Sequence, residues 1–162
     1  MSEAPSRRRP GPEQKRALRG AARFYAVQAL FQMEASDVPI GTILTEFEAH
    51  RIGAETESEH WAEADRNYFR RLIETAVERQ AKIDQMTDRA LVAKWPIDRI
   101  DPTLRALFRA AGAEMVGAQT PARVIISQFV EIAGAFFPEG REAGFVNAVL
   151  DHMAREARPE DF

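Results

Sequence analysis

Seven basic residues crowd into the first 23 positions of the chain, and their side chains offer one chemistry, the binding of phosphate groups. Against two acids they give this segment a net charge of +5, whereas the rest of the chain, with 15 basic and 23 acidic residues, carries −8. Guanidinium groups form paired hydrogen bonds with phosphate oxygens. A basic end on an acidic protein therefore predicts a local anion-binding site and not a general affinity for polyanions.

No other group of residues has the spacing of a catalytic or metal-binding site. The chain contains no cysteine, which excludes a disulfide framework and a thiolate nucleophile. Glu57 and His60 form a single Glu-x-x-His motif, whereas di-iron helical bundles use two such motifs and two further glutamates. We therefore predict no catalytic residue, no metal and no cofactor.

Apolar residues recur at steps of three and four along most of the chain, which is the period of an amphipathic helix. No segment keeps the alternation of a strand. Asp101-Pro102 and Thr120-Pro121 each place an N-cap side chain before a proline, a strong signal for a helix start. The pattern predicts an all-α fold of about seven helices, over residues 14–36, 40–50, 61–80, 102–117, 121–136 and 141–155, with one more that ends before Pro96.

The first 13 residues differ from the rest because they contain three prolines and no apolar spacing. They are expected to form a disordered basic arm, followed by a helical domain over residues 14–158. No apolar run approaches the roughly 20 residues that cross a bilayer. The N-terminus also lacks the apolar region of a secretory signal. These features predict a cytoplasmic protein without membrane contact.

The basic residues of the first predicted helix lie on one face. On a helical wheel Arg16, Arg19 and Arg23 fall within roughly 60° of one another and roughly 120° from the centre of the apolar stripe. An exposed row of three guanidiniums suits contacts with RNA or DNA phosphates. A solvated helix face without a ligand is the alternative.

The same helix also has three apolar residues outside its main stripe, namely Phe24, Val27 and Phe31. Apolar side chains on two sides of a surface helix indicate either deeper burial by neighbouring helices or contact with a partner.

Two parts of the sequence resemble a known family. “AARFYAVQALFQME” is similar to the opening helix, and “DPTLRALFRAAGAEM” with “TPARVIISQFVEIAGAFFPEGREAGFVNAVLDHMA” is similar to the last three helices, of the NusB family of bacterial transcription antitermination factors. The resemblance implies two small antiparallel helical bundles that bind boxA RNA, a single-stranded element, together with the ribosomal protein NusE. It further implies that this complex helps RNA polymerase to read through terminators in ribosomal RNA operons. A homodimer is left open.

The resemblance also implies which residues bind each partner. The residues implied for RNA are Lys15, Arg16, Arg19, Arg23, Arg141 and Phe145. Phe145 would be a platform on which a base stacks, and a core position is the alternative. Phe31 and Asp98 are implied for the protein partner. At Leu104 the sequence departs from the family, which commonly has an acid before the basic residue that matches Arg105.

Two other functions fit parts of the sequence. A NusB-like domain also precedes some ribosomal RNA methyltransferases, but that activity requires a methyl-donor-binding α/β domain, which we do not expect after Phe162. The second is a non-catalytic helical protein–protein interaction module without sequence-specific RNA binding. Sequence preference in RNA binding separates this module from an antitermination factor, the function that we predict.

Overall fold

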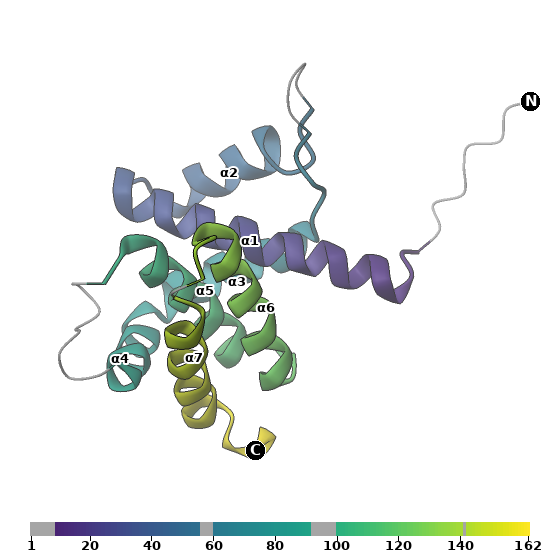
Figure 1. Ribbon diagram of the computed structural model, residues 1–162. Helices are drawn as coiled ribbons and strands as arrows, with labels where there is room; N and C mark the ends of the chain where they lie inside the picture. The colour runs from purple at the N-terminus through teal and green to yellow at the C-terminus, as the bar shows by residue number, and fades with distance from the viewer. Residues whose placement is uncertain (1–8, 56–59, 92–99, 141) are drawn as a thin grey trace, which may run out of the picture.

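The computed structural model describes residues 9–55, 60–91, 100–140 and 142–162, and these residues form helices without any strand (Figure 1). The helices are α1 (Pro12–Ser36), α2 (Ile40–His50), α3 (Arg66–Glu78), α4 (Gln80–Ala90), α5 (Pro102–Gly117), α6 (Ala122–Phe136), α7 (Ala143–Ala157) and the short 3-10 helix η2 (Pro159–Asp161). The predicted all-α fold is therefore confirmed. Of the described helices, none is long and apolar enough to cross a membrane.

Helix α5 lies at the centre and joins two groups of helices, α1–α3 on one side and α4, α6 and α7 on the other (Figure 1). Small residues, four of them alanines, are buried along it, so neighbouring helices can approach its backbone. At Gly112 an added Cβ would lie 2.4 Å from Cγ2 of Ile83 in α4. The missing side chain thus allows α4 to pack closely against α5.

Helix α1 is buried more widely than one apolar stripe predicts, because both α3 and α5 pack against it. Val27 is fully buried, and the Phe24 ring stacks on that of Phe136 with 5.1 Å between centroids. For these two residues the interpretation as burial holds. Phe31 differs, since 40% of it stays exposed. The first turns of α1 extend beyond the other helices (Figure 1), so the charged side chains at this end reach into solvent.

The third helix begins at Arg66 and not at Trp61, which corrects the predicted boundary. The backbone just before it is bound to another element, because the Asp65 N–H donates to the carbonyl of Leu18 at 3.0 Å. The Asp65 carboxylate then accepts a hydrogen bond from the N–H of Tyr68 at 3.0 Å. This cap starts α3 and holds its first turn against α1.

The two predicted proline-marked starts differ in their caps. Asp101 caps α5 as expected, by accepting a hydrogen bond from the N–H of Thr103 at 2.7 Å. Thr120 does not cap α6, since its hydroxyl lies 2.9 Å from that of Tyr68. The carboxylate of Asp161, from the C-terminal end of the chain, accepts from the first N–H of α6 at 2.9 Å instead.

Candidate nucleic-acid interface

Arg23 does not lie on an exposed face, and this part of the prediction is wrong. Only 3% of the residue is exposed. Its Nε and Nη2 donate to the two carboxylate oxygens of Glu114 at 2.7 and 2.8 Å, and its Nη1 donates to Gln128 at 3.1 Å. The wheel is misleading here because α5 and α6 cover a side of α1 that its own apolar stripe does not mark. The charge of Arg23 is already neutralised inside the protein.

The Arg23–Glu114 pair also anchors Tyr68. The Tyr68 hydroxyl donates a hydrogen bond to Glu114 and contacts the hydroxyl of Thr120. Burial, together with the nearby charge of Glu114, raises the pKa of Tyr68. Burial by itself lowers the pKa of Arg23, but the hydrogen bonds and charge of Glu114 outweigh it and raise that pKa overall. Both groups therefore stay protonated as hydrogen-bond donors at neutral pH.

A cavity of about 620 Å³ opens beside Tyr68. Residues from α1, α3, α6 and the loop between α5 and α6 line it, and none of these described residues is acidic. Four arginines contribute to the lining, namely Arg16, Arg19, Arg23 and Arg71. Of these, Arg16, Arg19 and Arg71 are exposed and form no ion pair with a described residue; we call these three the open cluster.

The other residues predicted to bind RNA fall into separate places. Lys15 is exposed on the first turns of α1, beside the open cluster in sequence. Phe145 lies on the first turn of α7, half-buried, with its ring centroid 6.3 Å from that of Phe108. It does not line the cavity, so the structure does not bring the predicted stacking platform and the arginines together. Arg141 lies outside the described residues.

Phe31 lines a different hollow, of about 380 Å³, on the second half of α1. Val27 and Phe136 are apolar members of its lining, and Arg51 and Thr103 are polar members. An exposed aromatic ring in a partly apolar hollow has the character of a protein contact. Asp98, the other residue predicted for the protein partner, lies outside the described residues.

Residues 20–155 match the model of the NusB family. The chain belongs to this family. A transcription antitermination protein NusB from Maricaulis maris (strain MCS10) is 45% identical over 153 residues, which cover 93% of this chain and 95% of the relative. The NusB of Rhodopseudomonas palustris (strain BisB18) is 44% identical, over 94% of this chain and 90% of the relative.

Solved structures of NusB proteins share the fold. T. maritima NusB matches with a TM-score of 0.70 and 29% identity, over 88% of this chain and 95% of that chain. A chain of the crystal structure of antitermination factors NusB and NusE with double-stranded RNA matches with a TM-score of 0.66 and 23% identity, over 85% and 96%. The comparisons confirm the predicted family and, with it, the predicted class of transcription antitermination factor.

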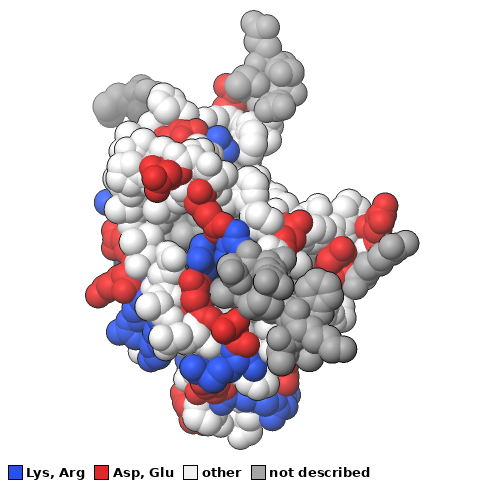
Figure 2. Space-filling model, turned by 90° about the vertical axis from the view of Figure 1, so that its left-hand side faces the viewer, with Lys and Arg blue, Asp and Glu red and all other residues white. Residues whose placement is uncertain are grey.

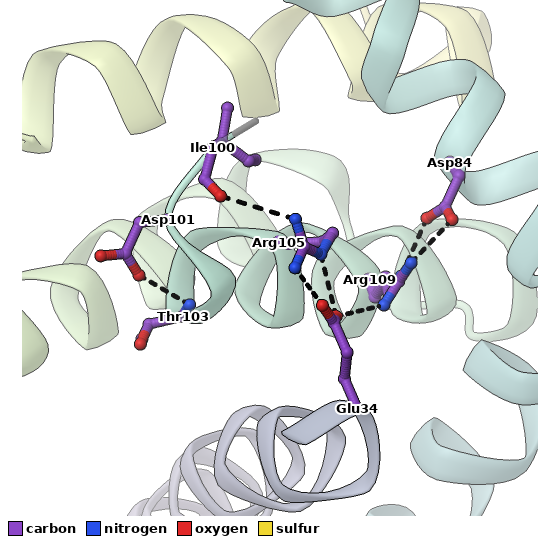
Figure 3. A network of polar contacts seen from close by, with 7 residues as sticks. All are labelled: Glu34, Asp84, Ile100, Asp101, Thr103, Arg105 and Arg109. Atoms are coloured by element: carbon purple, nitrogen blue, oxygen red, sulfur yellow. Dashed lines mark hydrogen bonds and ion pairs between the residues drawn. The ribbon is translucent and has the colours of Figure 1, made fainter. Parts of the chain in front are cut away.

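This NusB-family protein has a second arginine cluster, at the other end of α1. Figure 2 shows that end of the molecule, where basic and acidic side chains are interspersed. In the close view, Glu34 of α1 accepts hydrogen bonds from both Arg105 and Arg109 of α5 (Figure 3). Arg109 also donates to both carboxylate oxygens of Asp84 in α4, at 3.0 and 2.9 Å. We call Arg105 and Arg109 the paired cluster.

Electrostatics differ between the clusters because the paired cluster has its own counterions. Hydrogen bonds from Arg105, together with the charges of Arg105 and Arg109, lower the pKa of Glu34, so Glu34 stays ionised to a lower pH than an ordinary glutamate. Leu104 leaves Arg105 without the preceding acid that the family commonly has, and here Glu34 supplies a carboxylate from α1. The paired cluster is thus occupied by carboxylates of this chain.

Sequence reasoning missed Tyr68, Arg71 and Glu114. A signal existed for Glu114, because an acid inside the apolar run Ala110–Met115 must find a buried partner. No sequence signal connects Arg71 to Arg16 and Arg19 of α1, since more than 50 residues separate them and only the packing of α3 on α1 brings them to one cavity.

Proposed function

We propose that this protein is a transcription antitermination factor that binds boxA-type single-stranded RNA together with the ribosomal protein NusE. In this role it promotes read-through by RNA polymerase in ribosomal RNA operons, acts in the cytoplasm and performs no catalysis. The observation that carries the proposal is the open cluster, an unneutralised group of arginines on an acidic member of the NusB family.

RNA contacts are assigned to the exposed start of α1. Lys15, Arg16 and Arg19 are exposed on the N-terminal part of α1, so they can reach a flexible strand. Phosphate contacts supply affinity, and bases stacked on aromatic rings add to it. Phe145 is proposed as such a platform, and Arg141 as a further phosphate contact. Arg23 serves this site indirectly, because its guanidinium is already bound to Glu114 and Gln128.

The protein partner is assigned to the hollow around Phe31, with Asp98 as a second contact. The crystal structure of antitermination factors with double-stranded RNA contains NusB together with NusE. The acidic body of this chain suits a basic ribosomal protein. Residues 14–158 would form the binding unit, preceded by the basic arm.

A titration with two RNAs tests the proposed function. A labelled boxA-type RNA and a scrambled RNA of equal length and composition are titrated with the protein, each with and without NusE. We expect tighter binding of the boxA-type RNA, and a further gain when NusE is present. Equal affinity for both RNAs under all four conditions would support instead an interaction module without sequence-specific RNA binding.

A further inference from the structure

Arg71 lines the cavity beside Tyr68, although the resemblance to the NusB family does not imply this residue for RNA binding. Arg71 belongs to α3, and it reaches the same cavity as Arg16 and Arg19 of α1. Like charges that share a cavity repel one another, and no acidic side chain lines this one among the described residues. The arrangement is favourable when an anion occupies the space between the guanidiniums.

Tyr68 holds these cations in place. The guanidinium carbons of Arg19 and Arg71 lie 4.9 and 5.4 Å from the centroid of its ring. An aromatic face attracts a cation electrostatically, which orients both side chains without neutralising them. The hydroxyl of Tyr68 is engaged by Glu114 and Thr120, so the ring itself cannot swing into the cavity.

The loop that forms the opposite wall is also held firmly. Arg158 donates to the carbonyl of Met115 at 2.7 Å and to that of Ala118, at the end of α5. Asp161 accepts from the first N–H of α6 and from Arg158. The C-terminal end of the chain therefore clamps both ends of the loop over residues 118–121. Because the Tyr68 ring and the loop over residues 118–121 are both fixed by hydrogen bonds, the cavity is preorganised for a ligand.

We propose that this cavity is a phosphate-binding subsite for the backbone of single-stranded RNA, in which Arg71 of α3 contributes a contact together with Arg16 and Arg19. The inference rests on the proposed function and adds to it a site and a mode of recognition. Guanidiniums recognise phosphate oxygens bidentately, and contacts to phosphate position a strand without reading its sequence. Arg71 therefore increases affinity for boxA-type and scrambled RNA alike.

The test compares Arg71→Ala with Arg79→Ala. Arg79 follows the last residue of α3, is exposed and does not line the cavity, so its substitution removes the same charge just beyond the end of that helix. Affinities for boxA-type and scrambled RNA are measured over a salt series. Arg71→Ala should reduce the log–log salt slope by about 0.7, the value for one phosphate on a single strand. It should weaken the binding of both RNAs by the same factor.

Two further measurements test whether the charge of Arg71 is responsible and whether the ligand is RNA or the free anion. Arg71→Lys, which keeps the charge, should retain the wild-type slope. Inorganic phosphate, added at constant ionic strength, should weaken RNA binding by the wild type less than tenfold at millimolar concentration, because the subsite serves a polymer with several contacts. Tight binding of inorganic phosphate that RNA does not displace would instead make this a site for the free anion and would overturn the proposal.

The failures of the two proposals can be told apart. If the slope is unchanged in Arg71→Ala but reduced in Arg16→Ala/Arg19→Ala, RNA binds to α1 without using the cavity, and the subsite is refuted while the proposed function stands. If the wild type binds neither RNA, with or without NusE, the proposed function itself fails. A decrease in affinity in Arg79→Ala equal to that in Arg71→Ala would show a general charge effect and refute the subsite.

Discussion

The open cluster and the paired cluster lie toward opposite ends of α1 and contain the same residue type in opposite states. Arg16, Arg19 and Arg71 have no carboxylate partner among the described residues, whereas Glu34 and Asp84 bind Arg105 and Arg109. An anion that approaches the paired cluster has to displace a carboxylate that is already bound. The comparison shows that arginines of one protein differ in whether a carboxylate of the chain neutralises them, and only those without such a partner keep their full charge for an anion.

Arg23 lies between the two clusters along α1, and its side chain is in a third environment. It is buried and bound to Glu114 by two hydrogen bonds. Three arginine environments therefore occur on or beside one helix: a cluster without carboxylate partners among the described residues, a cluster that connects helices at the surface, and a buried ion pair in the core.

The largest effect is expected from Arg23→Ala. The substitution leaves Glu114 buried without its counterion, and breaking a buried pair in this way costs about 3–5 kcal/mol of unfolding free energy. Urea denaturation followed by circular dichroism measures it. The matched control is Arg19→Ala, an exposed change that should stay within about 0.5 kcal/mol of wild type. If both variants are equally stable, Arg23 is not a core residue and belongs with the open cluster.

Next in size is the effect of removing each cluster on RNA binding. Arg16→Ala/Arg19→Ala should weaken binding about tenfold or more, which is about 1.4 kcal/mol, and should reduce the salt slope by about 0.7 for each phosphate that is no longer neutralised. Arg105→Ala/Arg109→Ala removes the same charge and should leave the slope unchanged. Fluorescence anisotropy over a salt series measures both. Equal decreases in affinity in the two double variants would remove the distinction between the clusters.

A smaller effect is expected on stability from Glu34→Gln. The carboxylate is about one third exposed, at 34%, so its removal should cost about 1 kcal/mol or less. Its pKa in the folded protein is lowered by Arg105, below the value of about 4.3 in an unfolded chain. The stabilisation is therefore complete above the unfolded pKa and is lost as the pH falls through the folded pKa. Thermal melts at neutral and acidic pH should show less acid destabilisation in the variant than in wild type.

The smallest effect is expected when Glu34→Gln is tested with RNA. The substitution partly uncovers Arg105 and Arg109, and the paired cluster should then gain weak, sequence-independent affinity. An increase of the salt slope by less than the value for one phosphate, about 0.7, is expected with scrambled RNA. An unchanged slope would mean that the remaining contacts of the paired cluster keep it closed, and Asp84→Asn in the same background would test the contribution of Asp84 through Arg109.

Much of the fold could be predicted because it depends on local patterns. The spacing of apolar residues identified the helices, and Asp101 before Pro102 marked the start of α5 correctly. The start of α3 could not be predicted, since the Asp65 N–H is held by Leu18 of α1 and helical propensity does not record such a contact. The cap of α6 likewise comes from Asp161, 39 residues away in sequence.

The sequence by itself determined the family, the helical class and the concentration of positive charge at the start of α1, because each follows from residue types and their order along the chain. Only the tertiary structure decided which arginines remain available. Arg23 and Arg19 lie one helical turn apart with the same side chain, yet one is neutralised by Glu114 and the other faces a cavity shared with Arg71. The physical reason is that an ion pair depends on distance in space, and the carboxylate that binds Arg23 comes from a helix 91 residues farther along the chain.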